Sequence, residues 1–355
     1  MSNQAPKNIV IRCPNWVGDL VMCTPALRSI RKRFPDATIT AIVRPAIKQV
    51  IEYLPFIDAI IEYDKRRDRG IKSYLSFIKK LRSKHFDLGI ALTSSFSSAL
   101  LLFLSSIPIR VGYNRNGRGF LLTSKKEPLR ENGKIVPTNK VQLYLGLSDF
   151  LGCTELSTRP ELKTSSSAEA WVDRFFAEHS IKDRDFIVGI IPGSSFGPSK
   201  CWKEESFAKV ADALIKIYGA RILILPGPGE IERAHAIMQK MKESPVDMDD
   251  PIVPIDILMA LIRRCSLLIT NDTGPRHFAV AFDKPVIVLM GPTDSRHTDC
   301  NLEKTIILQE KVDCGPCHLR ECPTDHRCMI LITPEKVLTA VHHMIDKFHL
   351  TREEP

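Results

Sequence analysis

The sequence predicts an α/β protein of two domains, each a parallel sheet with helices on both faces. Three observations predict this class. Short apolar runs typical of strands alternate with helical patterns along both halves of the chain. Several of these runs end in loops rich in Gly, Pro, Ser, Asn and Asp, and the ligands of open parallel sheets gather at such strand ends. The length of 355 residues is sufficient for two domains of ordinary size.

The first half of the chain alternates strand and helix patterns as far as residue 151. Its strands are expected at residues 8–12, 37–43, 57–63, 86–92 and 109–113. Its helices are expected at residues 20–34, 47–54, 65–84 and 139–151, with a short apolar helix after residue 98. A polar passage at 155–167 marks the crossover, so the first domain is placed at residues 1–160.

The second domain, residues 161–355, repeats the pattern. Its strands are expected at residues 186–191, 221–225, 267–269 and 286–290. Its helices are expected at residues 205–218 and 255–265, with a short one that ends at residue 281. A Cys-rich stretch spans residues 314–328, and the last helix is expected either on this domain or packed back on the first.

Composition and charge restrict the function classes. With 44% hydrophobic and 26% charged residues, the chain has the composition of a soluble globular protein. No stretch approaches the ~20 apolar residues of a membrane span, and the N-terminal segment has no apolar signal core, so a cytoplasmic location is expected. Residues 1–160 carry 26 Lys and Arg against 12 Asp and Glu, a balance of +14 that leaves −5 for the rest. The basic half should meet nucleic acid, an anionic membrane surface, or a phosphorylated or carboxylated substrate.

The stretch 267–294 indicates an anion site. It is typical of a strand, a tight loop, a short helix and a second strand. Asp272 or Thr273 is expected to cap the helix, with Pro275 in its first turn. The N–H groups of such a helix start are available to an anion. The alternative is that these side chains only cap the helix.

A second loop suited to phosphate follows the strand at 186–191. Its hydroxyl groups and its one cation belong to Ser194, Ser195 and Lys200. Small residues let backbone N–H groups approach phosphate oxygens and Lys200 adds charge, although the spacing is not that of a Walker loop. Glu230, just past the strand at 221–225, stands where a carboxylate commonly accepts from ribose hydroxyls. Together the two loops predict a bound nucleoside diphosphate.

The first domain offers one carboxylate and three arginines as site candidates. Asp19 lies in the loop after the first strand and either caps the helix expected from Leu20 or takes a chemical role. Arg44 follows the second strand. Arg115 and Arg118 lie in a Gly-rich loop that suits a polyanionic acceptor better than a packed core.

Three motifs resemble those of a known family. They are residues 13–27 (CPNWVGDLVMCTPAL), 191–202 (IPGSSFGPSKCW) and 271–294. In this order, over nearly the whole chain, they are similar to the ADP-heptose:lipopolysaccharide heptosyltransferases of glycosyltransferase family 9, and most similar to the heptosyltransferase II type. The resemblance implies the GT-B fold, with two Rossmann-like domains that face each other across a cleft. It also implies inverting transfer of heptose from ADP-L-glycero-D-manno-heptose to the inner core of lipopolysaccharide, at the inner face of the cytoplasmic membrane.

The resemblance assigns roles by position. It implies Asp19 as general base, Lys200 on the donor phosphates and Glu230 near the ribose. It places four further residues around the diphosphate and sugar: Asp272, Thr273, Gly274 and His277, the last of which either reaches the diphosphate or packs. Inverting transfer needs a base to take the acceptor hydroxyl proton as an oxocarbenium-like state forms.

The leaving ADP can be stabilised by Lys200 and by N–H groups, so neither a cofactor nor a divalent metal is expected to be required. The expected partners are ADP-heptose as donor substrate, Kdo-lipid A or a heptosylated core as acceptor, and the anionic inner-membrane surface. Arg44, Arg115 and Arg118 are assigned to the acceptor. Nucleic acid is not expected as a partner.

A cysteine cluster departs from this pattern. Four cysteines lie within fifteen residues: Cys314, Cys317, Cys322 and Cys328. With His318 and His326 they could bind zinc or an iron–sulfur cluster. The spacing is tighter than in an ordinary two-knuckle zinc site, so reduced thiols or a redox-dependent disulfide are preferred over a structural metal.

Two other functions remain open. One is another GT-B enzyme, either a transferase of a different nucleotide sugar or a sugar-nucleotide epimerase, because nothing in the loops determines the base. The other is a nucleic-acid-binding protein with a Cys-bound metal, which the positive charge suggests. That alternative lacks a nucleic-acid-reading motif, and its positive charge lies in the half without the cysteine cluster.

Overall fold

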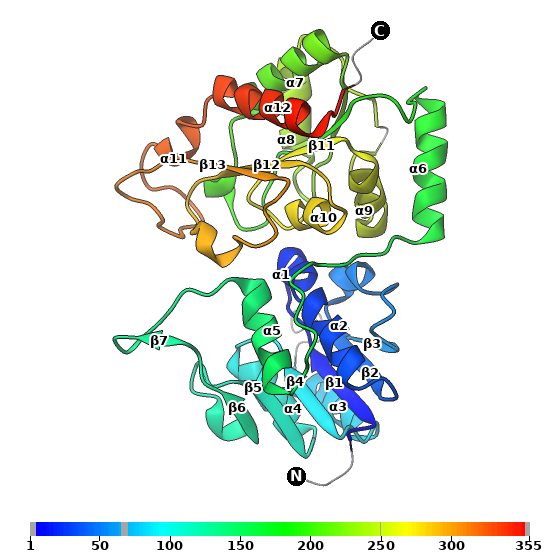
Figure 1. Ribbon diagram of the computed structural model, residues 1–355, viewed down its shortest axis with the longest axis vertical. Helices are drawn as coiled ribbons and strands as arrows, with labels where there is room; N and C mark the ends of the chain where they lie inside the picture. Colours follow the sequence, from blue (N-terminus) through cyan, green and yellow to red (C-terminus); the bar gives the residue numbers. More distant parts are fainter. Residues whose placement is uncertain (1–4, 65–69, 249, 352–355) are drawn as a thin grey trace. The chain divides into compact units, whose positions relative to one another are not determined.

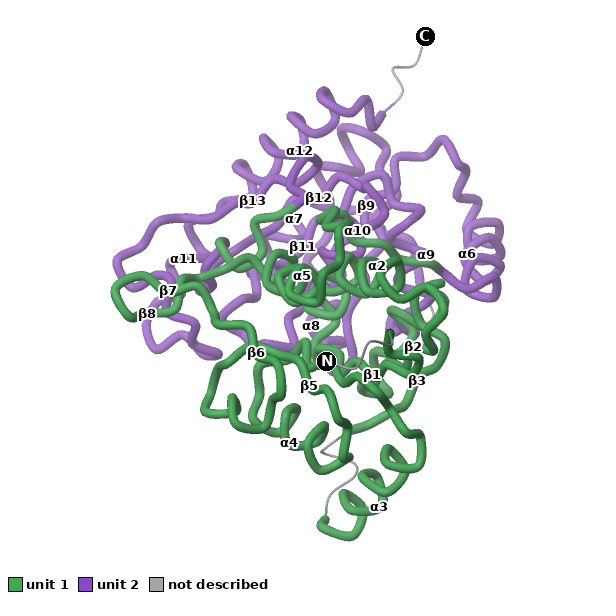
Figure 2. Tube along the Cα trace, turned by 60° about the horizontal axis from the view of Figure 1, so that its bottom comes forward, with its two compact units in different colours: residues 1–163, 296–300 green, residues 164–295, 301–355 purple. Residues whose placement is uncertain are grey.

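The computed structural model describes residues 5–64, 70–248 and 250–351. The chain divides into two units, which Figure 2 shows in different colours. Unit 1 comprises Met1–Lys163 with Arg296–Cys300, and unit 2 comprises Thr164–Ser295 with Asn301–Pro355. Figure 1 labels the helices and most of the strands. No described helix is long and apolar enough to cross a membrane.

Unit 1 contains a six-stranded parallel sheet in the order β3-β2-β1-β4-β5-β6. The strands are β1 Asn8–Arg12, β2 Thr38–Val43, β3 Ala59–Glu62, β4 Leu88–Ala91, β5 Ile109–Tyr113 and β6 Ser124–Lys126. The helices are α1 Val17–Met22, α2 Thr24–Arg33, α3 Ile71–Arg82, α4 Phe96–Leu104 and α5 Lys140–Phe150. Short 3-10 turns, η1 Pro45–Val50 and η2 Gly119–Leu121, and a small hairpin of β7 Arg130–Glu131 with β8 Lys134–Ile135 complete the unit.

Apolar side chains on both faces of this sheet explain its helical cover. Val10, Ile42 and Ile61 pack in one core cluster with side chains of α3 and α4. Neighbouring strand residues such as Ile9 and Ile11 are also fully buried, and strand geometry turns them to the opposite face. Of the remaining helices, α2 packs against α5. Burial on both faces is what near-continuous apolar strands predict.

The predicted helix 20–34 is two helices, α1 and α2, separated at Cys23. A continuous helix would need an N–H group at Pro25 to bond to the carbonyl of Val21, and proline has none. The hydroxyl of Thr24 donates to that Val21 carbonyl instead, at 2.8 Å. The break places Asp19 in the first turn of a short helix rather than at the start of a long one.

Unit 2 contains a five-stranded parallel sheet in the order β10-β9-β11-β12-β13. The strands are β9 Ile187–Ile191, β10 Arg221–Ile224, β11 Leu267–Asn271, β12 Val286–Met290 and β13 Thr305–Gln309. The helices are α6 Ser166–Glu178, α7 Glu204–Tyr218, α8 Ile231–Lys240, α9 Ile255–Arg264, α10 Arg276–Ala281, α11 Arg327–Ile330 and α12 Pro334–Phe348. The 3-10 turns are η3 Pro198–Lys200 and η4 Ser295–His297.

Helices cover both faces of the second sheet as well. One core cluster joins the strands to α7, α8 and α12, while α9 packs against α6 and α10. The last helix, α12, therefore packs on α7 and β12 of unit 2, the first of the two positions expected for it. Trp202 is buried beside Phe207 and donates its indole N–H to the carbonyl of Ile332, at 2.7 Å.

The strand order of each unit reverses beside its first strand. β9 lies between β10 and β11, and β1 lies between β2 and β4. Ligands of open α/β sheets bind at the carboxyl ends of strands where the order reverses. The loops after β1, β9 and β11, which hold most of the predicted site residues, are therefore at the favoured positions.

Some predicted elements differ from the observed ones. The helix expected at 47–54 is the 3-10 turn η1, which begins at Pro45. The passage 155–167 leads directly into α6, which the sequence analysis did not predict, and β6 and β13 were also missed. The helix expected at 65–84 is observed as α3 from Ile71, and residues 65–69 lie outside the described part of the chain.

Candidate active site

The two predicted phosphate loops adjoin in unit 2. Ile191, the last residue of β9, pairs with Thr270 near the end of β11. The segment Pro192–Trp202, hereafter the donor loop, therefore begins beside the loop that follows Asn271. Lys200 of the donor loop donates to the Asp272 carboxylate at 2.5 Å and to the Asp272 backbone carbonyl at 3.0 Å.

Asp272 is the centre of a buried charge cluster. Its Oδ1 accepts from Arg276 at 2.9 Å, and its Oδ2 accepts from the Thr293 hydroxyl at 2.7 Å as well as from Lys200. The side chain of Arg276 is 2% exposed, and those of Lys200 and Asp272 are 12% and 11% exposed. Two cations, Lys200 and Arg276, thus meet at one carboxylate where the two loops adjoin.

The cluster determines the protonation of its members. Burial would raise the pKa of Asp272, but the charges of Arg276 and Lys200 and hydrogen bonds from Lys200 and Thr293 outweigh it and hold the pKa well below the ordinary carboxyl range. Burial, and next the charge of Arg276, lower the pKa of His277 to about 3. At neutral pH Asp272 is therefore an anion and His277 is uncharged.

The expected capping role of Asp272 and Thr273 is wrong. Helix α10 begins at Arg276 with Pro275 at its N-cap, and no side chain caps it. The N–H groups of Arg276 and His277 bond to the carbonyls of Thr273 and Gly274. These helix-start groups are thus used within the turn. The side chain of Asp272 instead joins the donor loop to the loop after β11, through its bond to Lys200.

Asn271 is a site residue that the sequence analysis missed. Its side-chain amide donates to the carbonyl of Pro192 at 2.6 Å and accepts the backbone N–H of Trp202 at 3.1 Å. The two contacts lie at the two ends of the donor loop, so one buried amide fixes both ends to β11. The available sequence signal was an Asn at the end of an apolar strand pattern. Burying an Asn costs free energy unless its polar groups are hydrogen-bonded.

Glu230 lies against the start of the donor loop. Its carboxylate accepts the Gly227 N–H at 2.7 Å, and a Cβ placed on Gly193 would overlap that carboxylate. Burial raises the pKa of Glu230, against the opposing effects of the Gly227 N–H and Arg233. Glu230 is thus placed beside Gly193 at the carboxyl end of β9.

The remaining predicted donor residues are part of the two loops. Ser194 accepts the N–H of Phe196 at 3.3 Å through its hydroxyl and so shapes the donor loop, whereas Ser195 is exposed. Thr273 and Gly274 are half-buried.

Asp19 lies in unit 1, in the first turn of α1, and is half-buried. The N-cap position belongs to Trp16, so the expected capping alternative for Asp19 is wrong. The hydroxyl of Tyr144 on α5 donates to Asp19 Oδ1 at 3.1 Å. Burial, and next the charge of Asp19, raise the pKa of Tyr144, which keeps its phenol protonated as a donor. The sequence analysis missed Tyr144, which lies 125 residues from Asp19.

The three predicted acceptor arginines have different environments. Arg118 is fully buried and donates to the carbonyls of Tyr113 and Ser95 and the hydroxyl of Ser98, at 3.0, 3.2 and 2.9 Å. Burial, and next Arg115, lower its pKa to about 10. The prediction of Arg118 as an acceptor-binding residue is therefore wrong, because its guanidinium holds the β5 loop together.

Arg44 and Arg115 are half-buried. Arg44, the residue after β2, lies 3.5 Å from the carboxylate of Asp64. Both remain predicted acceptor residues.

The four cysteines of the cluster are free thiols. The hydroxyl of Thr324, and then backbone N–H groups of Thr324 and His326, lower the pKa of Cys322. Among the described residues, no three His, Cys, Asp or Glu side chains are arranged to hold a metal ion.

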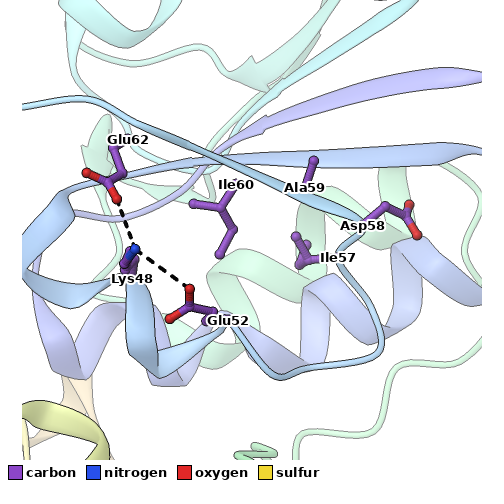
Figure 3. Close-up of a pocket in the computed structure, with 7 residues that line it drawn as sticks. All are labelled: Lys48, Glu52, Ile57, Asp58, Ala59, Ile60 and Glu62. Carbon is purple, nitrogen blue, oxygen red and sulfur yellow. Dashed lines mark ion pairs between the residues drawn. The ribbon is translucent and has the colours of Figure 1, made fainter.

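A surface pocket of unit 1 has none of the predicted site residues in its lining (Figure 3). It is lined by Lys48, Glu52, Ile57, Asp58, Ala59, Ile60 and Glu62. Lys48 lies 3.1 Å from Glu62 and 3.7 Å from Glu52. The third carboxylate of the lining, that of Asp58, pairs with Arg31 outside the pocket.

The low pKa of His277 gives a testable pH dependence of stability. In the unfolded chain its pKa is about 6.5, so below this pH the unfolded state gains a proton that the folded state does not. The free energy of unfolding should therefore decrease as the pH is lowered. Between pH 7.5 and 5, His277 alone should account for a decrease of about 2 kcal/mol. Urea titrations of the wild type and of His277→Asn measure the difference, with exposed His349→Asn as control. An equal pH slope in wild type and His277→Asn would contradict the assignment.

Comparison with known proteins identifies the family. The model of glycosyltransferase family 9 (heptosyltransferase) matches residues 74–327. The chain is 25% identical to lipopolysaccharide heptosyltransferase 2 of Salmonella typhimurium, over 96% of this chain and 99% of that protein. It is 28% identical to lipooligosaccharide heptosyltransferase 2 of Campylobacter jejuni, with the same coverage.

A solved structure supports the fold. The ADP-heptose lipopolysaccharide heptosyltransferase II of E. coli superposes with a TM-score of 0.77 at 22% identity, over 96% of this chain and 99% of that one. Two parallel-sheet α/β units are the GT-B architecture, as predicted. The chain is a glycosyltransferase and belongs to glycosyltransferase family 9, the heptosyltransferase family.

Proposed function

We propose that this enzyme transfers heptose from ADP-L-glycero-D-manno-heptose to the inner core of lipopolysaccharide, with inversion at the anomeric carbon. The observation that carries the proposal is the Lys200–Asp272–Arg276 cluster, which joins the loops after β9 and β11 and holds the Lys200 ammonium group at their junction. The names of the relatives support heptose transfer to lipopolysaccharide or lipooligosaccharide, and the name of the E. coli structure supports ADP-heptose as the donor.

Lys200 is assigned to the donor diphosphate. An ammonium group has three N–H donors, and in the described structure two of them bond to Asp272. The third can bond a phosphate oxygen and stabilise the charge that develops as ADP leaves. With this cation in place, a divalent metal is not required in the proposed reaction. Backbone groups of the donor loop at Ser194 and Ser195 complete the phosphate contacts.

The loop after β11 and the residues around it complete the donor site. Thr273, Gly274 and uncharged His277 are assigned to the diphosphate and the sugar. Glu230 is assigned to the ribose hydroxyls, because a carboxylate past a strand end accepts from them.

Asp19 is assigned as general base. Its carboxylate takes the proton of the acceptor hydroxyl while that oxygen bonds to the anomeric carbon, and the bond from this carbon to the ADP oxygen breaks. The reaction consumes one donor and one acceptor and releases ADP and a proton. Tyr144 holds Oδ1 of Asp19, which leaves the other carboxylate oxygen for the acceptor.

The acceptor, Kdo-lipid A or a heptosylated core, is anchored in a membrane, so the enzyme must work at a lipid surface. The balance of +14 in residues 1–160 supports contact with the anionic inner face of the cytoplasmic membrane. Arg44 and Arg115 are assigned to the acidic groups of the acceptor.

The direct test is incubation with ADP-heptose and heptose-deficient lipopolysaccharide, with mass detection of a product one heptose heavier. The reaction is run with and without EDTA. Thermal stabilisation by ADP, UDP and GDP tests the donor independently. Product formation together with stabilisation by ADP supports the proposal, whereas stabilisation by UDP or GDP alone would assign a different nucleotide sugar.

Replacement of Lys200 by Met should raise the Kd for ADP and lower turnover together. A charge-assisted hydrogen bond to phosphate contributes about 1.5–3 kcal/mol, or roughly 10- to 150-fold in affinity. Isothermal titration with ADP measures the binding, and initial rates measure the turnover. Lys203→Met, three residues further along the chain, is the matched control. Wild-type ADP affinity in Lys200→Met would show that the phosphate lies elsewhere.

A further inference from the structure

The Cys-rich segment, residues 314–328, contacts the donor loop although more than 100 residues separate them. The segment is built of turns and extended stretches before α11, and much of it is exposed. Both the segment and the donor loop belong to unit 2. The proposed reaction gives the segment no role.

Four hydrogen bonds join the two segments, and three of them involve Ser199. The N–H of Ser199 donates to the carbonyl of Arg320 at 3.1 Å, and its hydroxyl donates to the carbonyl of Leu319 at 2.6 Å. The carbonyl of Ser199 accepts from Nε2 of His326 at 2.6 Å. Arg320 Nε donates to the carbonyl of Phe196 at 2.7 Å. Every backbone and side-chain polar group of buried Ser199 is thus bonded to the Cys-rich segment.

Gly197 shows how closely the two segments pack. Its φ of 155° lies in a region that side chains disfavour, and a Cβ built on it would overlap the backbone carbonyl of Arg320. A carbonyl in the main chain cannot move aside as the end of a flexible side chain can. The donor loop therefore requires glycine here because the Cys-rich segment lies directly against it.

Lys200 follows Ser199 directly, so the bonds to Ser199 determine where the Lys200 backbone lies. Site residues are effective only when their supporting contacts hold them within a fraction of an ångström of the productive position. Asn271 fixes the two ends of the donor loop. The Cys-rich segment fixes its middle.

We propose that the Cys-rich segment is a clamp that positions Lys200 for the donor diphosphate, and that His326 and Arg320 are its positioning residues. The ligand chemistry affected is that of a nucleoside diphosphate, so the inference rests on the proposed function. His326 must carry its proton on Nε2, because the Ser199 carbonyl can only accept. The clamp acts on donor binding and leaves acceptor binding to unit 1.

The first test compares His326→Ala, His326→Gln and His349→Ala in the full chain. His349 is exposed and has a left-handed backbone like His326, with φ of 49° against 59°, so it controls for loss of a histidine in that conformation. His326→Ala should raise the Kd for ADP and the KM for ADP-heptose about 3- to 10-fold, with the acceptor KM unchanged. His326→Gln, whose amide can donate to the same carbonyl, should recover most of the loss.

The second test uses glycine. Gly197→Ala should displace the Arg320 carbonyl and weaken ADP binding at least as much as His326→Ala. Gly219→Ala is the matched control, since Gly219 also has a positive φ, of 61°, but has no neighbour within 4 Å of a built Cβ.

Hydrogen exchange tests the clamp independently of the proposed function. In the absence of any ligand, the amide of Ser199 should exchange faster in His326→Ala than in wild type, because its acceptor is the Arg320 carbonyl of the clamp. Failure of the wild type to bind ADP would reject the proposed donor while leaving the exchange result to test the clamp. Unchanged Ser199 exchange and unchanged ADP affinity in folded His326→Ala would overturn the clamp.

Discussion

Replacement of Asp19 by Asn is expected to lower the turnover of heptosyl transfer by about 10²- to 10⁴-fold, the range over which a positioned general base contributes. The amide has nearly the shape of the carboxylate but cannot take a proton from the acceptor hydroxyl. ADP affinity should be unchanged, because Asp19 belongs to unit 1 and the donor loops belong to unit 2. Initial rates and ADP titration on the same preparation measure the two quantities.

Two further variants serve as references for this test. Tyr144→Phe removes only the hydrogen bond to Oδ1, so it should lower turnover by a smaller factor, about 3- to 10-fold. Asp36→Asn changes an exposed carboxylate of the same unit and should leave the rate at the wild-type value. Retention of most of the turnover in a folded Asp19→Asn enzyme would show that another group is the base.

Local patterns in the sequence were sufficient for the strands. The runs at 8–12, 109–113 and 286–290 were predicted with the bounds that β1, β5 and β12 have. An apolar run buried on both faces of a parallel sheet is a local signal and needs no knowledge of its neighbours. The fold class could therefore be predicted from sequence alone.

Long-range contacts account for most of what the sequence analysis missed. The sequence placed Arg118 in an exposed Gly-rich loop, whereas in the structure its guanidinium donates to the carbonyls of Thr93 and Ser95, more than twenty positions away. Asp272 and Lys200 were both predicted at the donor site, but their ion pair spans 72 residues and gave no local signal. The clamp on Ser199 spans 120 residues or more. Side-chain chemistry indicated which residues matter, whereas the partners depend on the tertiary structure.

The buried charge cluster gives the largest expected effect on stability. Asp272→Ala should lower the free energy of unfolding by about 3–5 kcal/mol, because it removes the carboxylate that pairs with both buried Arg276 and Lys200. Adding Arg276→Met removes the buried cation that faced this carboxylate, so the double variant should regain part of the loss. Denaturant titration at pH 7 measures each variant. Asp173→Ala, which breaks an ion pair at 2.6 Å with a largely exposed carboxylate, should cost less than about 1 kcal/mol.

The pH dependence of the unfolding free energy tests the same cluster with Asp272→Asn, a substitution of nearly equal shape. The folded-state pKa of Asp272 lies below its unfolded value of about 4. Its stabilisation is therefore fully present above pH 4 and is lost as the pH falls towards the folded value. Asp272→Asn cannot ionise, so its unfolding free energy should fall less steeply below pH 4 than that of the wild type. Parallel acid slopes for the two proteins, or a double variant no more stable than Asp272→Ala, would mean that the ion pair with Arg276 does not stabilise the site.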